Sequence, residues 1–194
     1  MDIVVATNNK GKLAELKKIL SNYNVLSQSE VGADVEVEET GTTYEENALL
    51  KAEAIRPYTD KIIIADDSGL EVDVLGGAPG LYSARYAGDN TTPEQGMAKL
   101  LENLKPYTSD EKTAHFICCI ALIESDGTKH SFYGRCNGHI TDEKRGTAGF
   151  GFDPIFIADR YSETFAEMDG EEKNKISHRR KAIEALKEYL DSKI

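Results

Sequence analysis

The chain has 194 residues, 40% hydrophobic and 29% charged, which is ordinary for a globular protein. Its 34 acidic and 23 basic side chains leave a formal net charge of −11, which argues against coating DNA or RNA. No apolar stretch approaches the roughly 20 residues that span a bilayer, so we expect no membrane association.

The first third of the chain predicts two strands and two helices. Ile3–Ala6 is typical of a short buried strand, and apolar residues on one face predict a helix over about 13–21. Valines alternate with acidic residues over 34–38, which predicts a half-exposed strand. Threonine followed three residues later by glutamate predicts a capped helix that runs to Pro57.

The remaining elements include a buried strand over Lys61–Ala65 and a helix that Thr92 caps. Residues 113–124 are apolar on both faces, and Asp126-Gly127 predicts a hairpin to a partner strand over 129–138. A last helix begins near Ser177. This mixture predicts a single lobed α/β domain over residues 1–194, with a mixed sheet, flanking helices and a central cleft.

Three cysteines, Cys118, Cys119 and Cys136, have no zinc-type spacing and lie in apolar or strand-like segments. We expect them to be reduced core residues of a cytoplasmic protein. The N-terminus begins as a strand and lacks the basic region of a signal peptide, which favours the same compartment.

Asp66 and Asp67 follow the strand over Lys61–Ala65, where a buried strand is expected to end in a loop. Carboxylates at such a place need a metal ion, a proton or a cation nearby. Adjacent strand residues point to opposite faces, so one of the pair can face a given site while the other has a structural role. The alternative is an ordinary turn, since Asp-Ser-Gly is common turn chemistry.

Several segments could bind phosphate and metal. Thr7–Lys12 is a strand-to-helix turn with two ammonium groups, where free N–H groups attract anions. Acidic pairs at 38–39, 45–46 and 66–67 offer the oxygen ligands that Mg²⁺ prefers, and one acid could deprotonate an attacking water. The alternatives are a solvated helix start and a solvated acidic surface.

A basic cluster over 173–181 includes His178 and Arg179 in the first turn of the last helix, where cations oppose the helix dipole. That mismatch favours an anionic or hydrogen-bonding ligand, and the alternative is a face that offsets nearby acids. The aromatic, glycine-rich segment over 149–154 could stack on a planar base or could pack in the core.

Together these segments closely resemble the inosine triphosphate pyrophosphatase family, also called the XTP/dITP diphosphatases. The motifs keep the family's order over nearly the whole chain. They comprise residues 7–12, 39–52, 65–73, 76–86, 149–154 and 177–179. Phe152 stands where many relatives carry tyrosine or tryptophan.

The resemblance implies hydrolysis of ITP, dITP and XTP to the monophosphate and pyrophosphate, in a homodimer that needs Mg²⁺. It also implies an elongated mixed sheet of two lobes with the site in the cleft. Asp67 would be the general base and would bind Mg²⁺ with the Glu38-Glu39 pair; the spacing from Gly41 favours Glu38, with Glu39 left open.

The motif residues implied to contact the nucleoside triphosphate come from both halves of the chain. They are Thr7, Asn8, Asn9, Lys10, Gly11, Lys12, Lys51, Ser68, Phe150, Gly151, Phe152, Asp153, Lys173, His178 and Arg179. The alternatives are a related pyrophosphatase for modified pyrimidine nucleotides, a nucleotide-binding regulator without catalysis, and a scaffold protein. A substrate panel separates the first, and the acids at 38, 39 and 67 argue against the regulator.

Overall fold

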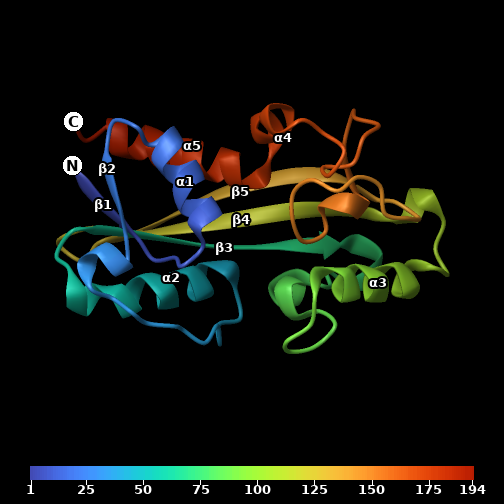
Figure 1. Ribbon diagram of the computed structural model, residues 1–194, viewed down its shortest axis with the longest axis horizontal. Helices are drawn as coiled ribbons and strands as arrows, with labels where there is room; N and C mark the ends of the chain where they lie inside the picture. The colour runs from blue at the N-terminus through green and yellow to red at the C-terminus, as the bar shows by residue number, and fades with distance from the viewer. The chain divides into compact units, whose positions relative to one another are not determined.

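The computed structural model describes residues 1–194, and its six strands form one mixed sheet in the order β2-β1-β3-β4-β5-β6 (Figure 1). The strands are β1 (Asp2–Val5), β2 (Asn24–Ser27), β3 (Ile62–Val72), β4 (Thr113–Ile123), β5 (Lys129–Ile140) and β6 (Phe156–Ala158). Strand β1 is parallel to β2 and β3, whereas β5 and β6 are antiparallel. The predicted α/β class with a mixed sheet is confirmed.

Five α-helices accompany the sheet, and none is long and apolar enough to cross a membrane. They are α1 (Lys10–Ile19), α2 (Tyr44–Ile55), α3 (Pro93–Leu104), α4 (Gly170–Ile176) and α5 (His178–Asp191). The predicted caps are confirmed: Thr43 accepts from the Glu46 N–H, and Thr92 forms a full capping box with Gln95.

The chain divides into two compact units. Unit 1 comprises residues 1–67, 118–134 and 181–194, and unit 2 comprises 68–117 and 135–180. Strands β3, β4 and β5 each contribute residues to both units. Asp67 is therefore the last residue of a unit 1 segment, and Ser68 is the first residue of unit 2.

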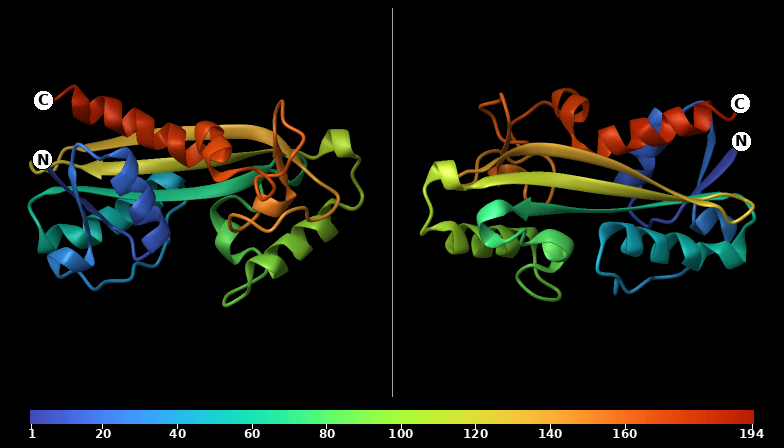
Figure 2. Two further views of the ribbon diagram at one scale, coloured as in Figure 1. Left: turned by 45° about the horizontal axis from the view of Figure 1, so that its top comes forward. Right: turned by 180° about the vertical axis from the view of Figure 1, so that it is seen from behind.

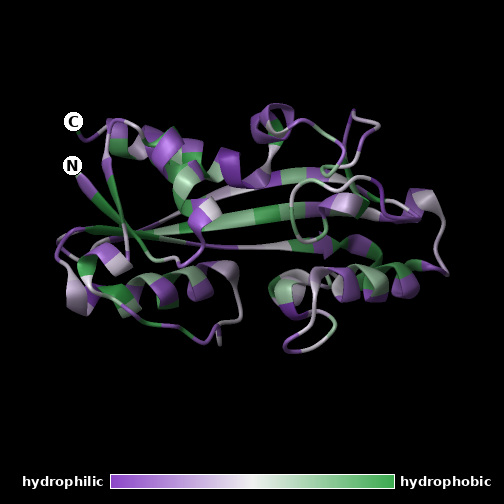
Figure 3. Ribbon diagram, viewed as in Figure 1, coloured by the Kyte–Doolittle hydropathy of each residue, from purple (hydrophilic) through white to green (hydrophobic).

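The core of unit 1 lies on both faces of its strands. Ile3 and Val5 of β1 pack with residues of α1 and α5, while Val4, between them, packs with residues of α2. Within this unit, α1 and α5 cover one face and α2 covers the other (Figures 1 and 2). This alternation follows from the two-residue period of a strand, and Figure 3 shows β1 as hydrophobic along most of its length.

The core of unit 2 is rich in aromatic rings. Phe116 of β4 and Phe156 of β6 meet edge to face, with ring centroids 4.6 Å apart, and Phe156 makes a similar contact with Phe165 at 5.0 Å. Helix α3 adds Leu100 and Leu104, which are fully buried.

The three cysteines are free and buried, as predicted.

Two predicted boundaries were wrong: the end of strand β3 and the start of helix α1. Strand β3 does not end at Ala65 but continues to Val72, so Asp66 and Asp67 lie within the strand. The turn chemistry of Asp-Ser-Gly is overridden because β3 is paired with the long strand β4. Helix α1 begins at Lys10, three residues earlier than predicted, with Asn9 as its N-cap.

The segment over residues 33–40 is neither helix nor strand, contrary to the prediction, and β2 provides the edge of the sheet instead. The buried side chain of Gln28 explains part of this difference. Its Nε2 donates to the carbonyl of Val35 at 3.0 Å and to that of Ala33 at 3.3 Å. A side chain therefore takes backbone acceptors that strand pairing would use. We call residues 33–41 the acidic loop, because they include Asp34, Glu36, Glu38 and Glu39.

Candidate active site

The turn between β1 and α1 is braced by its own side chains. The Thr7 hydroxyl accepts from the Asn9 N–H at 3.1 Å, and the Asn9 side chain accepts from the Lys12 N–H at 3.0 Å. No acidic residue lies in the first turn of this ten-residue helix. Its N-terminus therefore presents positive charge and free N–H groups suited to an anion such as phosphate.

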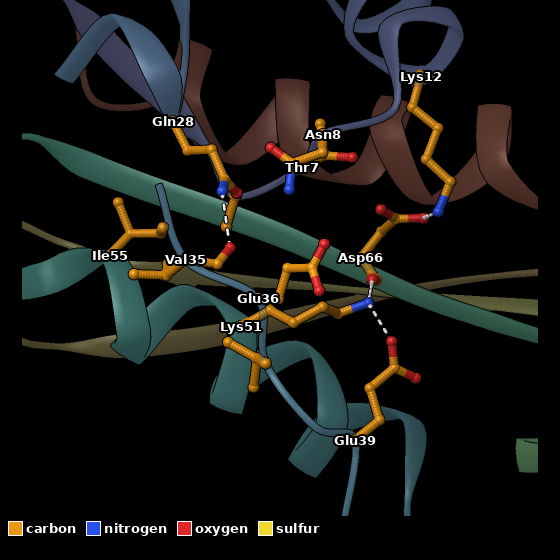
Figure 4. Close-up of a pocket in the computed structure, with 12 residues that line it drawn as sticks. Thr7, Asn8, Lys12, Gln28, Val35, Glu36, Glu39, Lys51, Ile55 and Asp66 are labelled. Carbon is orange, nitrogen blue, oxygen red and sulfur yellow. Dashed lines mark hydrogen bonds and ion pairs between the residues drawn. The ribbon is translucent and has the colours of Figure 1, made fainter. Parts of the chain in front are cut away.

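Two lysines from different helices meet at Asp66 (Figure 4). Lys12 of α1 lies 2.9 Å from the Asp66 carboxylate. Lys51 of α2 donates to the Asp66 carbonyl oxygen and lies 3.3 Å from Glu39 on the acidic loop. Of the two adjacent acids, Asp66 is the one that lines the adjoining cavity, and its carboxylate is paired with Lys12.

These residues surround a cavity of about 330 Å³, which lies within the size range of small-ligand sites. Its lining comprises Ala6, Thr7, Asn8, Lys12, Gln28, Val35, Glu36, Val37, Glu39, Lys51, Ile55 and Asp66. Asn9, Lys10 and Gly11 lie beside it in the loop and the first turn of α1 and are exposed, and Glu38 is also exposed.

Asp67 is buried, with 8% of its surface exposed, and its side chain bonds Asn47 of α2. Burial raises the pKa of the Asp67 carboxyl to about 6; Glu39 and Asp66 also raise it, while Lys51 and the bond from Asn47 act in the opposite direction. A carboxyl group with a pKa near the working pH is suited to act as a general base.

The oxygen donors beside Asp67 fit a hard divalent cation. Glu39 and Asp66 raise the pKa of Asp67 through their charges, so their carboxylates lie near it, while Lys51 acts in the opposite direction. No preformed cluster of three or more potential ligands is present. Mg²⁺ needs only one or two protein carboxylates when phosphate oxygens and waters complete its shell. Of the Glu38-Glu39 pair, Glu39 is the residue that lines the cavity.

A second group of predicted residues comes together within unit 2. Buried Asp153 accepts from the Phe150 N–H at 3.0 Å and from Lys173 of α4 at 2.6 Å. The Phe150 ring is 61% exposed, and Lys173 and Arg179 lie over it, with Nζ and Cζ at 5.0 Å and 5.3 Å from its centroid. An exposed ring flanked by two cations is a suitable surface for a flat, electron-rich base.

The start of α5 is held rigidly. The Ser177 hydroxyl accepts from the Arg180 N–H, which confirms the predicted cap. The His178 ring stacks on Phe116, with centroids 4.8 Å apart and planes 13° apart. His178 and Arg179 are both buried, and Arg179 is the one that lies over the exposed ring of Phe150.

The remaining predicted contacts fall in less exposed places. Phe152 is only 6% exposed and packs in the unit 2 core close to Gly96 of α3, so its ring offers no open face for a base to stack on. Gly151 has a positive φ of 60° and is half-buried, and Ser68 follows Asp67 in β3, also half-buried.

Sequence reasoning missed the roles of two buried carboxamides. Gln28 and Asn47 each hold part of the acidic loop, and Asn47 also bonds Asp67. A signal for Asn47 was present, because it directly precedes the apolar Ala48 and Leu49 in α2. A polar residue on a buried helix face needs hydrogen-bond partners.

Comparisons with known proteins agree over the whole chain. The model of the Ham1 family matches residues 3–189. A Clostridium perfringens protein named dITP/XTP pyrophosphatase is 48% identical over 96% of both chains. A Bacillus subtilis protein of the same name is 46% identical over 98% of both.

Solved structures show the same fold. The Staphylococcus aureus Ham1 protein superposes with a TM-score of 0.93 at 45% identity, covering 100% of both chains. A nucleoside-triphosphatase, or dITP/XTP pyrophosphatase, from Mycobacterium abscessus has a TM-score of 0.81 at 38% identity, covering 96% of this chain and 97% of that one. The family resemblance drawn from the motifs is thus confirmed, and the chain belongs to the Ham1 family.

Proposed function

We propose that the protein hydrolyses the non-standard purine nucleoside triphosphates ITP, dITP and XTP to the monophosphate and pyrophosphate, and so removes them from the nucleotide pool. The relatives named dITP/XTP pyrophosphatase support this reaction. The observation that carries the proposal is Asp67, a buried carboxyl group with a pKa of about 6 beside Lys51 and Glu39.

The phosphates of the substrate bind the residues around the unit 1 cavity. We call Lys12, Lys51, Glu39, Asp66 and Asp67, with the N-terminus of α1, the unit 1 group. The N-terminus of α1, Lys12 and Lys51 offset the charge that develops on the phosphate oxygens. Lys12 must exchange its bond to Asp66 for one to phosphate. Ser68, next to Asp67 in β3, is assigned a substrate contact through its hydroxyl.

Asp67 accepts a proton from the attacking water. The water oxygen forms a bond to the α-phosphorus while the bond from that phosphorus to the α,β-bridging oxygen breaks. Pyrophosphate leaves with the bridging oxygen and its electron pair, and the monophosphate gains the hydroxyl. No covalent enzyme intermediate is needed.

The oxygen donors beside Asp67 support Mg²⁺ as the cofactor of this site, with Asp67 and one of Glu38 and Glu39 as its proposed protein ligands. When bound, the ion supplies positive charge to the phosphate oxygens. We favour Glu39 over Glu38, because it lines the cavity and lies beside Lys51.

The base binds the residues around Phe150 in unit 2. We call Phe150, Asp153, Lys173, His178 and Arg179 the unit 2 group. Phe150 offers an exposed ring, and Arg179 and His178 offer donors that suit the 6-oxo group of hypoxanthine or xanthine. Adenine carries an amino group at that position, so donor would meet donor and buried groups would lose their partners.

We also propose, from the family resemblance, that the enzyme works as a homodimer in the cytoplasm. Three free, buried cysteines are in keeping with a reducing compartment. Sedimentation velocity at micromolar protein concentration tests the assembly: a single species of about twice the chain's 21.4 kDa is expected, and one of 21.4 kDa would contradict it.

The reaction is tested by pyrophosphate release from ITP, dITP, XTP, dATP, dGTP and dUTP, each with Mg²⁺ or with EDTA. We expect release in Mg²⁺ from the first three nucleotides and little from the others. Release mainly from dUTP would contradict the assigned base specificity, and orthophosphate as the product would contradict the assigned bond.

A further inference from the structure

Asn47 connects two parts of unit 1 that carry acidic residues. Its side chain is buried, with 2% of the residue exposed, near the start of α2. The Oδ1 atom accepts from the Gly41 N–H at the end of the acidic loop, at 2.7 Å. The same side chain bonds Asp67 of β3, and because a carboxylate only accepts, the Asn47 amide nitrogen is the donor.

Gly41 is fitted to this contact. A Cβ atom built on Gly41 would lie 2.7 Å from Asn47 Oδ1 and 2.7 Å from the Cβ of Glu46. Both distances are too short for an ordinary contact, so only glycine allows the loop backbone to approach α2 this closely.

The acidic loop depends on such side-chain bonds for its position, because it has no helical or strand hydrogen bonds of its own. Gln28 holds its first half at Ala33 and Val35, and Asn47 holds its end at Gly41. Of these two carboxamides, Asn47 is the one that also bonds Asp67, so its bond sets the end of the loop relative to that carboxylate.

We propose that Asn47 is a positioning residue that sets the spacing between the acids at the end of the acidic loop and Asp67, so that together they bind the divalent cation. This inference rests on the proposed function and deepens it. Asn47 acts through Gly41 and Asp67 rather than by touching substrate. Changes to residues that orient metal ligands typically cost 10–100-fold in metal affinity or activity.

The test compares three variants. Asn47→Leu removes both hydrogen bonds at similar volume, and Gly41→Ala disturbs the same contact from the loop side. The control is Glu46→Ala on the same helix. Glu46 is exposed, and its carboxylate accepts from the N–H and the hydroxyl of Thr42, the residue that follows Gly41. It loosens the loop attachment without removing the Asn47 bond to Asp67.

Three quantities are measured on each protein: the Mn²⁺ dissociation constant by electron paramagnetic resonance, the Mg²⁺ concentration for half-maximal dITP hydrolysis, and the melting temperature. We expect Asn47→Leu and Gly41→Ala to weaken Mn²⁺ binding and raise the Mg²⁺ requirement about tenfold or more. At saturating Mg²⁺, the KM for dITP should change less than threefold. Glu46→Ala should stay within about threefold of the wild type in both metal measurements.

Several outcomes would overturn the proposal. One is a lowered melting temperature with unchanged metal binding in both test variants, because a structural role alone would explain it. Another is an equal loss in Glu46→Ala, and a third is no Mn²⁺ binding by the wild type. If Asn47→Leu fails to fold, Gly41→Ala decides.

The two failures are distinguishable. Wild-type protein that binds Mn²⁺ but releases no pyrophosphate from any nucleotide contradicts the proposed function and leaves the positioning role standing. If the wild type hydrolyses dITP but Asn47→Leu and Gly41→Ala bind the metal as the wild type does, the positioning role is contradicted and the proposed function stands.

Discussion

The unit 1 and unit 2 groups differ in the chemistry they offer. The unit 1 group consists of charged side chains in close pairs, such as Lys12 with Asp66, around a buried carboxyl group with a raised pKa. The unit 2 group centres on the exposed ring of Phe150 and the cations over it. Under the proposed function, separate sets of residues carry bond cleavage and base selection, and substitutions can test the two roles separately.

The largest effect is expected for Asp67→Asn in unit 1. Loss of the general base should lower kcat about 10²–10⁴-fold for every nucleotide accepted, since the proton of water then has no acceptor. Nucleotide affinity, measured by calorimetry, should change little. A variant that keeps a near wild-type kcat would remove Asp67 from its assigned role.

Arg179→Ala in unit 2 should mainly change selectivity. Losing the donor to the 6-oxo group should lower the preference for dITP over dATP in kcat/KM by roughly 10–100-fold. The loss should come from weaker use of dITP rather than from a general loss of cleavage. An unchanged preference would exclude Arg179 from base recognition.

The raised pKa of Asp67 predicts a pH effect on the metal-free protein. A folded-state pKa of about 6 against an ordinary value of 3.8 means that the folded state binds the proton more tightly. The resulting stabilisation is complete below about pH 4 and is lost as the pH rises through about 6. Urea unfolding in EDTA should show Asp67→Asn gaining on the order of 2 kcal/mol relative to the wild type between pH 4 and pH 7.5. An equal pH dependence of the two proteins would contradict the assigned pKa.

The smallest effect is expected for Lys12→Ala, which removes one phosphate-binding charge. The KM should rise about five- to tenfold for dITP and dATP alike, because the phosphates are common to both. Lys17→Ala is a matched control, since Lys17 is an exposed lysine in the last turn of the same helix. Equal effects of the two substitutions would reduce the role of Lys12 to general surface charge.

The elements that sequence predicted well are those fixed by local chemistry. The Thr92 capping box and the Asp126-Gly127 hairpin depend on a few adjacent residues, and both are present; Gly127 has a φ of 89°. Phe150, Asp153, Lys173 and Arg179, which the family resemblance singled out, lie together in the structure, while their roles stay predictions.

The features that sequence missed depend on residues far apart in the chain. The pairing of β3 with β4 keeps Asp66 and Asp67 in a strand despite their turn chemistry. The Gln28 side chain donates to the backbone carbonyls of Ala33 and Val35, in a segment whose valines and acidic residues alternate as they would in a strand. Core packing of Phe152 was one of two alternatives for the aromatic segment, and its contact partner, Gly96, is too far away in the chain for a local pattern to indicate it.

The most direct test is the ratio of kcat/KM for dITP to that for dATP, measured at saturating Mg²⁺ in the wild type, Lys12→Ala and Arg179→Ala. If the unit 1 group serves cleavage and the unit 2 group serves base selection, Lys12→Ala should keep the wild-type ratio while Arg179→Ala loses most of it. The separation would be contradicted if Lys12→Ala lowered the ratio as much as Arg179→Ala, or if neither changed it.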